Sequence, residues 1–460
     1  MERYREAVDY LQRRLWHELP IVPVERALQA RIRHLLAHFG DPHRAMPVIH
    51  VGGSAGKGST SAIAQAILQA AGLRTGLYTS PHLQTFIERI RVDDAFIAPG
   101  RFADLVLGLD PLVRKMHLEV IDGVGFGRPA LVEVAFAAGM KHFADERCDA
   151  AVVEVGLGGR TDCTNVFDET PAVPVITNID YEHRERLGWS ISSIAREKAD
   201  IIHGGLAITG ARRPEALAMI EARAAERRAE LWRLGREVRA RVTGATEEGS
   251  TFDVTTPFGS FRSLRLPLAG AHQVANASLA VAASLAFAGM TGRAIDDPHV
   301  REGLARVRLS GRLETVQRDP LVLLDAAHNP LEARRLVEAL RAHWLRPERR
   351  LHMVAGILAD KDQPSMVRAL ATVAGTVVVT QPPLGERAGD PERMLRLFRR
   401  PLGEGSVSFE PSHMRALDLA LGAAARDDIV LVTGSMYLVG AVRERWVSEQ
   451  QILQRRSAVA

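Results

Sequence analysis

The chain has 460 residues, which is too long for one ordinary hydrophobic core, so we expect at least two domains. Its 46% hydrophobic and 25% charged residues are typical of a globular protein, and a net charge of only +4 argues against a dedicated nucleic-acid-binding protein. Two cysteines (Cys148 and Cys163), the lack of an apolar run of membrane-spanning length and a charged N-terminus unlike a signal peptide predict a cytoplasmic protein without a disulfide framework or a membrane partner.

The first regular segment is a strand followed by a glycine-rich loop and a helix. "MPVIHVGG" (46–53) is apolar and β-branched, and "STSAIAQAILQAAGL" (59–73) has helical spacing. The loop between them departs from the common phosphate-binding pattern, because a glycine follows Lys57 and the hydroxyl groups come one position late, at Ser59 and Thr60. Its glycines would let the backbone approach an anion, and Lys57 would reach the terminal phosphates. A tight strand-to-helix turn without a ligand is the alternative.

Strands and helices continue to alternate along the first part of the chain. We predict further strands at 74–80, 148–159, 172–180 and 205–210, with helices at 131–146 and 190–202. Such alternation predicts a doubly wound, mostly parallel sheet, here a P-loop ATPase domain. Residues 235–268 instead alternate in polarity and carry turn signals, which predicts a small antiparallel appendage before a helix at 272–290.

The alternation restarts near residue 310. We predict a helix at 332–344 and strands at 321–330, 351–358, 376–383 and 428–440. The domains are therefore expected at 1–308 and 309–460, the second being a smaller α/β domain. Its last segment, 449–460, is predicted to be a fraying helix.

Several predicted strands end in polar residues, where parallel sheets bind ligands. Glu154 ends one buried strand, and Asp180, Glu182 and His183 follow the next. A buried acid is costly unless it is paired or bound to a metal, so either a metal or an arginine partner is open for Glu154. His183 by itself is more typical of a hydrogen-bonded structural histidine. In the second domain, Asp325, His328 and Asn329 close a strand, and Arg312 lies just upstream, where it would clamp a polyphosphate or form an interdomain salt bridge.

Lysine is rare in this arginine-rich chain, with five occurrences: Lys57, Lys115, Lys141, Lys198 and Lys361. A lysine kept in such a chain is expected where a compact ammonium or a reactive amine is needed. Lys57, Lys198 and Lys361 each lie in a separate motif, although retention by chance is the alternative.

Ten motifs stand in the order found in one known enzyme family. They are the glycine loop, "YTSPHL", "ERIRV", "EVGLGG", "LGWSISSIAREKA", "GAHQVANA", "SGRLE", "DAAHNP", "GILADKD" and "VTGSMYLVG". From about residue 4 to residue 440 the chain resembles folylpolyglutamate synthase/dihydrofolate synthase, a family of ATP-dependent amide ligases in the Mur ligase superfamily. The resemblance implies addition of L-glutamate to a folate or dihydropteroate carboxylate through an acyl phosphate, with release of ADP and phosphate. It also implies ATP as co-substrate, two Mg²⁺ ions and a monomer.

Residue roles follow from this resemblance, position by position. The ATP-binding positions are Gly56, Lys57, Gly58, Ser59, Asn276, Arg312, Asp325 and His328. The magnesium ligands are Ser80, Glu154, His183 and Lys198, whose amine the superfamily carbamylates. The catalytic groups among these are Lys57, Lys198, His183 and Glu154. The pterin-side contacts are Ala130, Leu131, Val132, Glu133, Thr161, Asp162 and Cys163.

The chain also departs from the family pattern. Ser54-Ala55 replaces Thr-Asn, Val132 replaces Phe, Glu182 replaces Asp, Asp200 replaces Gly, and the stretch 18–26 lacks a usual Asp. The pterin-side departures favour folylpolyglutamate synthase activity at least equal to dihydrofolate synthase activity. The alternatives are a Mur-type ligase for another carboxylate, such as a cell-wall precursor, and a non-catalytic nucleotide-binding relative. Lys198 and the acidic strand ends argue against the second alternative.

Overall fold

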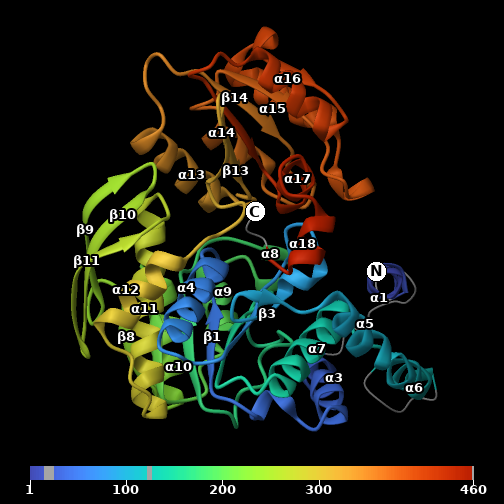
Figure 1. Cartoon of the computed structure of the whole chain (residues 1–460), viewed down its shortest axis with the longest axis vertical. Coiled ribbons are helices and arrows are strands. Elements are labelled where there is room, and N and C mark those ends of the chain that lie inside the picture. The colour runs from blue at the N-terminus through green and yellow to red at the C-terminus, as the bar shows by residue number, and fades with distance from the viewer. Residues whose placement is uncertain (15–24, 122–126, 458–460) are drawn as a thin grey trace.

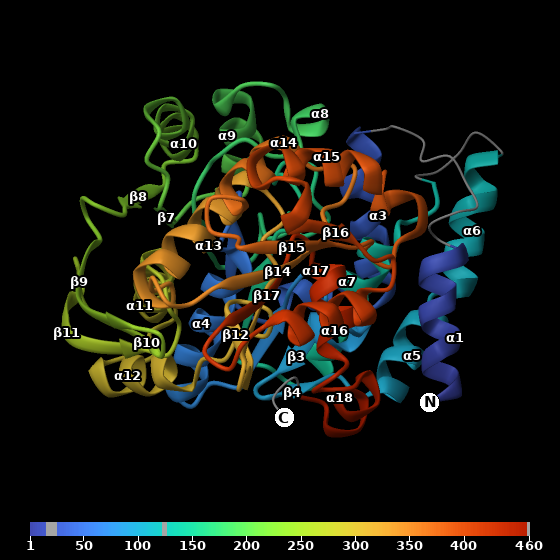
Figure 2. The same cartoon turned by 90° about the horizontal axis from the view of Figure 1, so that it is seen from above.

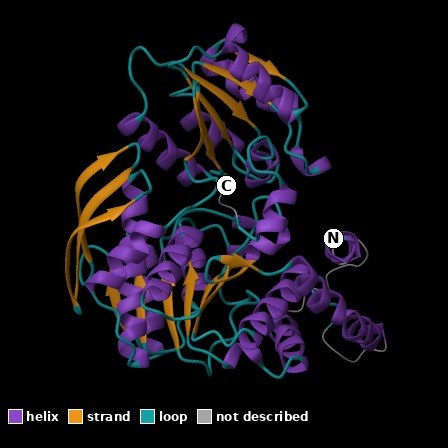
Figure 3. Ribbon diagram, in the orientation of Figure 1, coloured by secondary structure: helices purple, strands orange, loops and turns teal. Residues whose placement is uncertain are grey.

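The computed structural model describes residues 1–14, 25–121 and 127–457, which form two α/β parts, one above the other in Figure 1. The lower part contains an eight-stranded sheet with a separate three-stranded sheet at its side, and the upper part contains a six-stranded sheet (Figure 3). The predicted α/β class is confirmed, while the division after residue 308 stays a prediction.

The eight-stranded sheet has the strand order β4-β3-β2-β5-β1-β6-β7-β8. From β2 through β5, β1, β6 and β7 to β8 the neighbouring strands are parallel, whereas the pairs β2–β3 and β3–β4 at one edge are antiparallel. The central strands are apolar and buried because hydrophobic clusters pack against them. The strands are β1 Val48–Gly52, β2 Thr75–Tyr78, β3 Ile90–Val92, β4 Ala95–Phe96, β5 Ala150–Glu154, β6 Ala172–Ile176, β7 Leu206–Thr209 and β8 Glu230–Arg233.

Two buried helices, α4 (Lys57–Ala70) and α11 (Ala271–Thr291), pack together against the central strands. By length and composition, α11 could cross a membrane, so the expectation that no apolar run is long enough was wrong. However, 72% of its most apolar window is buried inside the protein, which is the position of a core helix.

The remaining helices of the lower part surround this sheet. They are α1 Glu2–Asp9, α3 Glu25–His38, α5 Pro99–Gly108, α6 Asp110–Ile121, α7 Leu131–Asp145, α8 Arg184–Leu187, α9 Ile191–Ala199, α10 Pro214–Glu226 and α12 Asp297–Arg306, with short helical turns η1 Tyr10–Arg14, η2 Pro42–Arg44 and η3 Phe86–Arg89. Figure 2 shows α1 and α6 on the opposite side of the molecule from the three-stranded sheet.

The predicted antiparallel appendage is this three-stranded sheet, with the order β11-β10-β9. Its strands are β9 Arg239–Thr246, β10 Gly249–Thr256 and β11 Gly259–Leu266. Alternate residues of β10, including Phe252 and Val254, are buried, whereas β9 is exposed along its length. The alternation therefore marks a sheet with one solvated face.

The upper sheet has the order β12-β13-β17-β14-β15-β16 and is parallel except for β12. Its strands are β12 Glu314–Arg318, β13 Leu321–Asp325, β14 Leu351–Ala355, β15 Thr376–Val379, β16 Val407–Phe409 and β17 Ile429–Thr433. Its helices are α13 Pro330–His343, α14 Gln363–Leu370, α15 Pro391–Leu402, α16 His413–Ala423, α17 Met436–Arg443 and α18 Glu449–Arg455, with turns η4 Gly385–Ala388 and η5 Glu404–Ser406.

Two predictions near the C-terminus were wrong. The strand expected over 428–440 ends at Thr433, because Gly434 has a φ of 107° and the Ser435 side chain accepts a hydrogen bond from the Tyr437 N–H and caps α17. The helix expected to fray is anchored, since Ile452 and Leu453 of α18 are buried. Arg456 then exchanges two hydrogen bonds with Phe96 of β4, which fastens the end of the upper part to the lower sheet.

Candidate active site

The glycine loop joins β1 to α4 in a conformation that only glycine adopts easily at two positions. Gly53 has a φ of 134° and Gly56 a φ of 84°. A Cβ at Gly56 would stand 2.3 Å from the Asn276 side-chain oxygen, and one at Gly53 would stand 2.0 Å from the Thr177 hydroxyl. The loop is therefore held between the end of β6 and the start of α11.

The residues after β6 fix the loop by hydrogen bonds. The Ala55 N–H donates to the Asn178 side chain over 2.9 Å, and the Thr177 hydroxyl donates to the Ala55 carbonyl over 2.7 Å. Ser54 has its own partner, because the Asp180 N–H donates to the Ser54 hydroxyl over 3.0 Å. The departure from the family's Thr-Asn thus leaves a loop whose polar groups are satisfied by neighbouring strand ends.

A pocket lies between this loop and the upper part of the molecule. Its lining is Ala55, Gly56, Gly58, Ser59, His272, Gln273, Asn276, Arg312, Leu313, Asp325, Glu332, Arg335 and Leu336. Of the predicted ATP-binding positions, Gly56, Gly58, Ser59, Asn276, Arg312 and Asp325 are in this lining, while Lys57 and His328 are not. The sequence reasoning missed His272, Gln273, Glu332 and Arg335. The first two lie in the "GAHQVANA" motif, so this motif could have predicted them as nucleotide-pocket residues.

The upper wall of the pocket is organised around Asp325, at the end of β13. Its carboxylate accepts hydrogen bonds from the N–H groups of Leu313 at 2.9 Å and Ala327 at 3.0 Å. Burial raises the pKa of Asp325 to about 6, although the Arg312 charge opposes the rise. Close by, the His328 ring nitrogen Nδ1 lies 3.1 Å from the Glu332 carboxylate. His328 thus holds a wall residue of the pocket.

Glu154 is buried at the end of β5, beside the N-terminus of α4. Burial raises its pKa, and the charges of Lys57, Arg312 and Arg89 oppose the rise. Its carboxylate accepts a hydrogen bond from the Ser80 N–H over 3.0 Å. The Lys57 ammonium donates to the Gly53 carbonyl over 3.2 Å. The alternative of an arginine ion pair for Glu154 is therefore wrong for the described residues, because no arginine lies within ion-pair distance of it there.

Lys198 and Glu182 form a buried ion pair of 2.5 Å, and the Lys198 ammonium also donates to the Gly53 carbonyl over 3.0 Å. Burial alone would raise the pKa of Glu182, but the Lys198 and Lys57 charges outweigh it and hold that pKa below its usual value. Burial lowers the pKa of Lys198. The longer side chain of Glu182, in place of the usual Asp, thus reaches the lysine under the phosphate loop.

His183 and Asp200 lie near the same lysine. Burial lowers the pKa of His183 to about 4, with the Lys361 charge acting in the same direction, so the imidazole is neutral at neutral pH. Asp200, where the family usually has Gly, forms a 2.7 Å ion pair with Arg223 of α10. The charge that Asp200 introduces at this position is therefore paired with an arginine of α10.

The donors around Glu154 fit a magnesium ion shared with a polyphosphate. A Cβ at Gly58 would stand 3.5 Å from the Glu154 carboxylate, so this anion faces the helix N-terminus that would also receive phosphate. Two anions at one helix terminus need a cation between them. In residues 1–14, 25–121 and 127–457, no three His, Cys, Asp or Glu side chains are grouped to hold a metal alone. Mg²⁺ suits such a place, because it usually binds one or two carboxylates and completes its shell with waters and phosphates.

The two predicted pterin-side segments contact each other. The Cys163 thiol donates to the Val132 carbonyl over 3.8 Å, and Val132 is 39% exposed. Glu133 instead serves the fold, because it is buried in an ion pair with Arg31 at 2.7 Å. Asp162 accepts hydrogen bonds within its own loop, including one of 2.8 Å from the Leu157 N–H. The segment before Glu25, where the family's usual Asp is missing, lies outside the described residues.

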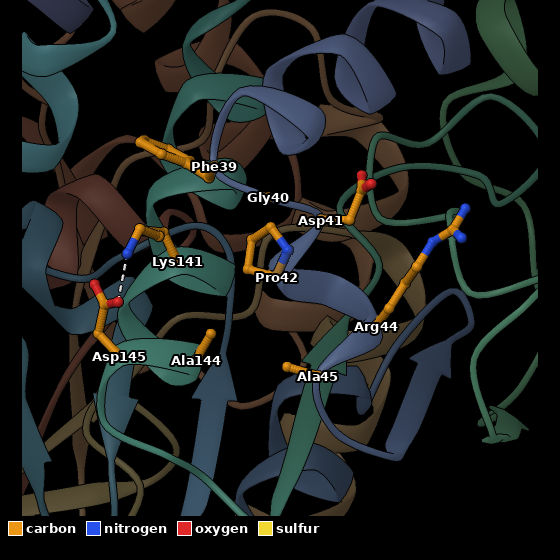
Figure 4. Close-up of a pocket in the computed structure, with 9 residues that line it drawn as sticks. All are labelled: Phe39, Gly40, Asp41, Pro42, Arg44, Ala45, Lys141, Ala144 and Asp145. Carbon is orange, nitrogen blue, oxygen red and sulfur yellow. Dashed lines mark hydrogen bonds and ion pairs between the residues drawn. The ribbon is translucent and has the colours of Figure 1, made fainter.

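A different hollow, drawn in Figure 4, contains none of the predicted site residues. It lies among α3, η2 and α7, where Lys141 is directed to Asp145 of its own helix. Arg44 extends away from this pair in Figure 4 and forms a 2.8 Å ion pair with Glu169. Its charged groups therefore do not converge on a common point, in contrast to the interdomain pocket.

Comparisons with known proteins agree with this geometry. Residues 131–284 match the Mur ligase middle domain, and residues 311–436 match the Mur ligase, glutamate ligase domain. A phosphate loop facing a second α/β part, with these two matches, defines the chain as an ATP-dependent ligase of the Mur type.

The relatives identify the family within this class. The chain is 35% identical to the dihydrofolate synthase/folylpolyglutamate synthase of Mycobacterium tuberculosis, over 95% of this chain and 92% of that protein. It is 32% identical to the folylpolyglutamate synthase of Lacticaseibacillus casei, over 96% of this chain and 98% of that protein. The structure of Mycobacterium tuberculosis folylpolyglutamate synthase complexed with ADP matches with a TM-score of 0.87 and 32% identity, covering 97% of this chain and 98% of that chain. The chain belongs to the folylpolyglutamate synthase/dihydrofolate synthase family, as the sequence resemblance implied.

Proposed function

We propose that this enzyme uses ATP to join the amine of L-glutamate to a carboxylate of a folate or of dihydropteroate. The observation that carries the proposal is the pocket in which the glycine loop faces Asn276, Arg312 and Asp325. The phosphates would lie at the N-terminus of α4, where backbone N–H groups and the helix dipole favour negative charge. The structure of the Mycobacterium tuberculosis relative, complexed with ADP, supports the binding of an adenine nucleotide.

In the first step, an oxygen of the substrate carboxylate attacks the γ-phosphorus, and the bond to the β-phosphate oxygen breaks. ADP leaves, and the substrate becomes an acyl phosphate. Lys57 and Arg312 would hold the polyphosphate from the two domains, with Gly56, Gly58 and Ser59 contacting it through the loop. A magnesium ion held by Glu154 and Ser80, with His183 and a carbamylated Lys198 holding a second, would neutralise phosphate charge and align the reacting oxygens.

In the second step, the neutral amine of glutamate attacks the acyl carbon, the carbon–oxygen bond to phosphate breaks, and the amine loses a proton. The pterin would lie against Ala130–Glu133 and Thr161–Cys163, where Val132 and Cys163 reach the surface. Closure of the two domains would exclude water from the acyl phosphate. His328 and Asn276 would position the nucleotide rather than take part in bond breaking.

We further propose that the enzyme is a cytoplasmic monomer. Its two cysteines are free, and its long apolar helix is buried, which supports a protein of a reducing compartment. Its mass in solution, measured by light scattering, would contradict this proposal if it were a multiple of the chain mass.

A substrate panel tests the proposed function. Release of ADP is measured after adding glutamate with dihydropteroate, with a tetrahydrofolate or with a cell-wall precursor carboxylate, and products are identified by mass. Glutamate-dependent ADP release with at least one of the first two is expected. Turnover with the cell-wall precursor alone, or nucleotide binding without turnover of any carboxylate, would overturn the proposal.

A further inference from the structure

Arg89, in the "ERIRV" motif, is a buried cation without a carboxylate partner. It ends η3, its exposed fraction is 6%, and its Nη1 atom is buried without a hydrogen-bond partner. Within the residues that the structure describes, no carboxylate is within ion-pair distance of this guanidinium. Burying an unpaired charge is costly, so a fold retains it only where a ligand or another compensating group supplies the missing charge.

Two other buried arginines, Arg31 and Arg443, have such partners. Arg31, with a side chain 5% exposed, forms a 2.7 Å ion pair with Glu133, and Arg443, at 2%, forms a 2.8 Å pair with Glu314. Those two arginines are satisfied by carboxylates of the fold itself. Arg89 therefore differs from the arginines that serve only to hold elements together.

The position of Arg89 is between the phosphate side and the pterin side of the site. The Thr79 N–H donates to the Arg89 carbonyl over 3.0 Å, and the N–H of the next residue, Ser80, donates to the Glu154 carboxylate over 3.0 Å. Next to it, the Tyr78 hydroxyl donates to the Val132 carbonyl over 3.5 Å. A carboxylate carried by a pterin bound against Val132 would have to pass this point to reach a γ-phosphate near Glu154.

The guanidinium is also held in a fixed orientation. Its Nε donates to Nδ1 of His82 over 2.9 Å, and its Cζ lies 5.3 Å from the centre of the Phe86 ring. Because the Arg89 Nε–H is the donor, Nδ1 of His82 is the acceptor and carries no proton in this contact. The Nε edge of Arg89 is therefore used by the protein, while the buried Nη1 has no protein partner and could donate to an anion.

Resting on the proposed function, we propose that Arg89 binds the substrate carboxylate that becomes phosphorylated, with His82 as the residue that positions it. The guanidinium offsets the charge of the carboxylate as it attacks the γ-phosphorus. It then stays against the carbonyl oxygen of the acyl phosphate, where negative charge develops when the glutamate amine attacks the carbon. Phosphate departs with the carbon–oxygen electron pair, and Arg89 keeps its proton throughout.

The test compares Arg89→Gln and Arg89→Lys with the wild type. Arg91→Lys is the matched control, since Arg91 is in the same motif but donates to Gln65 of α4. We expect kcat/KM for the pterin carboxylate to fall about 100-fold in Arg89→Gln, with ADP affinity changed less than about threefold. Arg89→Lys should retain part of the activity. Unchanged kcat/KM in Arg89→Gln, or an equal loss in Arg91→Lys, would overturn the inference.

Calorimetry provides a readout that does not depend on turnover. Wild-type enzyme should bind the dihydropteroate carboxylate at least about tenfold more tightly than the matching carboxamide, and Arg89→Gln should bind both equally. If Arg89→Gln fails to fold, the wild-type enzyme alone still tests the inference. Equal binding of the carboxylate and the carboxamide by the wild type would contradict the role given to Arg89. Lack of glutamate-dependent turnover by the wild type would instead contradict the proposed function itself.

Discussion

Lys198 and Glu182 form a 2.5 Å ion pair under the phosphate loop, and the same ammonium donates to the Gly53 carbonyl over 3.0 Å. Burial lowers the pKa of this lysine, which favours the neutral amine that carbamylation requires. The ion pair and the predicted carbamate are alternative states of one side chain, because a carbamate is an anion and would be repelled by Glu182 unless a cation lay between them.

We therefore predict that Lys198→Arg is correctly folded and inactive. Arginine can keep the ion pair with Glu182 but cannot form a carbamate, so ADP release should fall at least about 100-fold. Turnover is measured with the substrate that the panel identifies, and folding is checked by thermal denaturation. The companion variant Lys198→Ala should be partly rescued by short carboxylates. An active Lys198→Arg enzyme, without a carbamate signal after labelling with ¹³C-bicarbonate, would contradict the prediction.

The phosphate-loop lysine should be required for turnover but not for folding. Lys57 is partly exposed, and within the described residues it forms no ion pair and donates to the Gly53 carbonyl over 3.2 Å, so its loss breaks no buried ion pair. Lys57→Ala should lose nearly all ATP turnover and keep the wild-type melting temperature. Lys141→Ala is the control, since Lys141 is one of the few other lysines and pairs with Asp145 on α7. Wild-type turnover in Lys57→Ala would remove the basis for the loop assignment.

Asp180 couples the two domains next to the nucleotide pocket. Its carboxylate lies 3.0 Å from Arg213 of the lower part and 3.1 Å from Arg334 of α13, whose neighbour Arg335 lines the pocket. We predict that Asp180→Asn and Arg334→Gln each raise KM for ATP about tenfold, and that the double variant is no worse than either single one. Arg341→Ala, on the same helix, should have no effect, because Arg341 donates within the upper part to the Thr372 carbonyl. Additive losses in the double variant would show that the pair is not coupled.

Val132 provides a test of substrate preference. It replaces a usual aromatic residue and is 39% exposed beside Cys163, so it offers little area to a pterin ring. We predict that folylpolyglutamate synthase activity at least equals dihydrofolate synthase activity, and that Val132→Phe strengthens dihydropteroate binding about threefold to tenfold. Steady-state kinetics with both substrates measure this. A clearly higher kcat/KM for dihydropteroate in the wild type would contradict the preference.

Local sequence patterns predicted most strands and the phosphate loop because alternation, β-branching and glycine act over a few residues. The same reasoning failed at 428–440, where an apolar run continues through a glycine turn from β17 into α17. Ion pairs between residues distant in sequence could not be predicted from local patterns. The "YEH" motif does not indicate that Glu182 pairs with Lys198, and the sequence of α13 does not indicate that Arg334 pairs with Asp180. The ligand roles came from the resemblance to a family, which the spacing of residues alone does not provide.

Buried histidines should make the protein sensitive to acid. Burial lowers the pKa of His43 and His142 to about 4 and that of His50 to about 3. In the unfolded chain these groups bind protons with a pKa of about 6.5. From about pH 6.5 down to about pH 4 the unfolded state therefore holds more protons than the folded state, and the free energy of unfolding falls as the pH falls. Each group contributes on the order of 1–2 kcal/mol at about pH 5.

His43→Leu isolates one of these contributions. Both ring nitrogens of His43 are buried without a partner, so leucine should leave stability unchanged or raise it at about pH 7.5, and should reduce the loss on going to about pH 5. Urea denaturation at the two pH values measures the difference, with His343→Leu, at a partly exposed position of α13, as the control. If the variant lost as much stability as the wild type between the two values, protonation of His43 could not be a cause of acid unfolding.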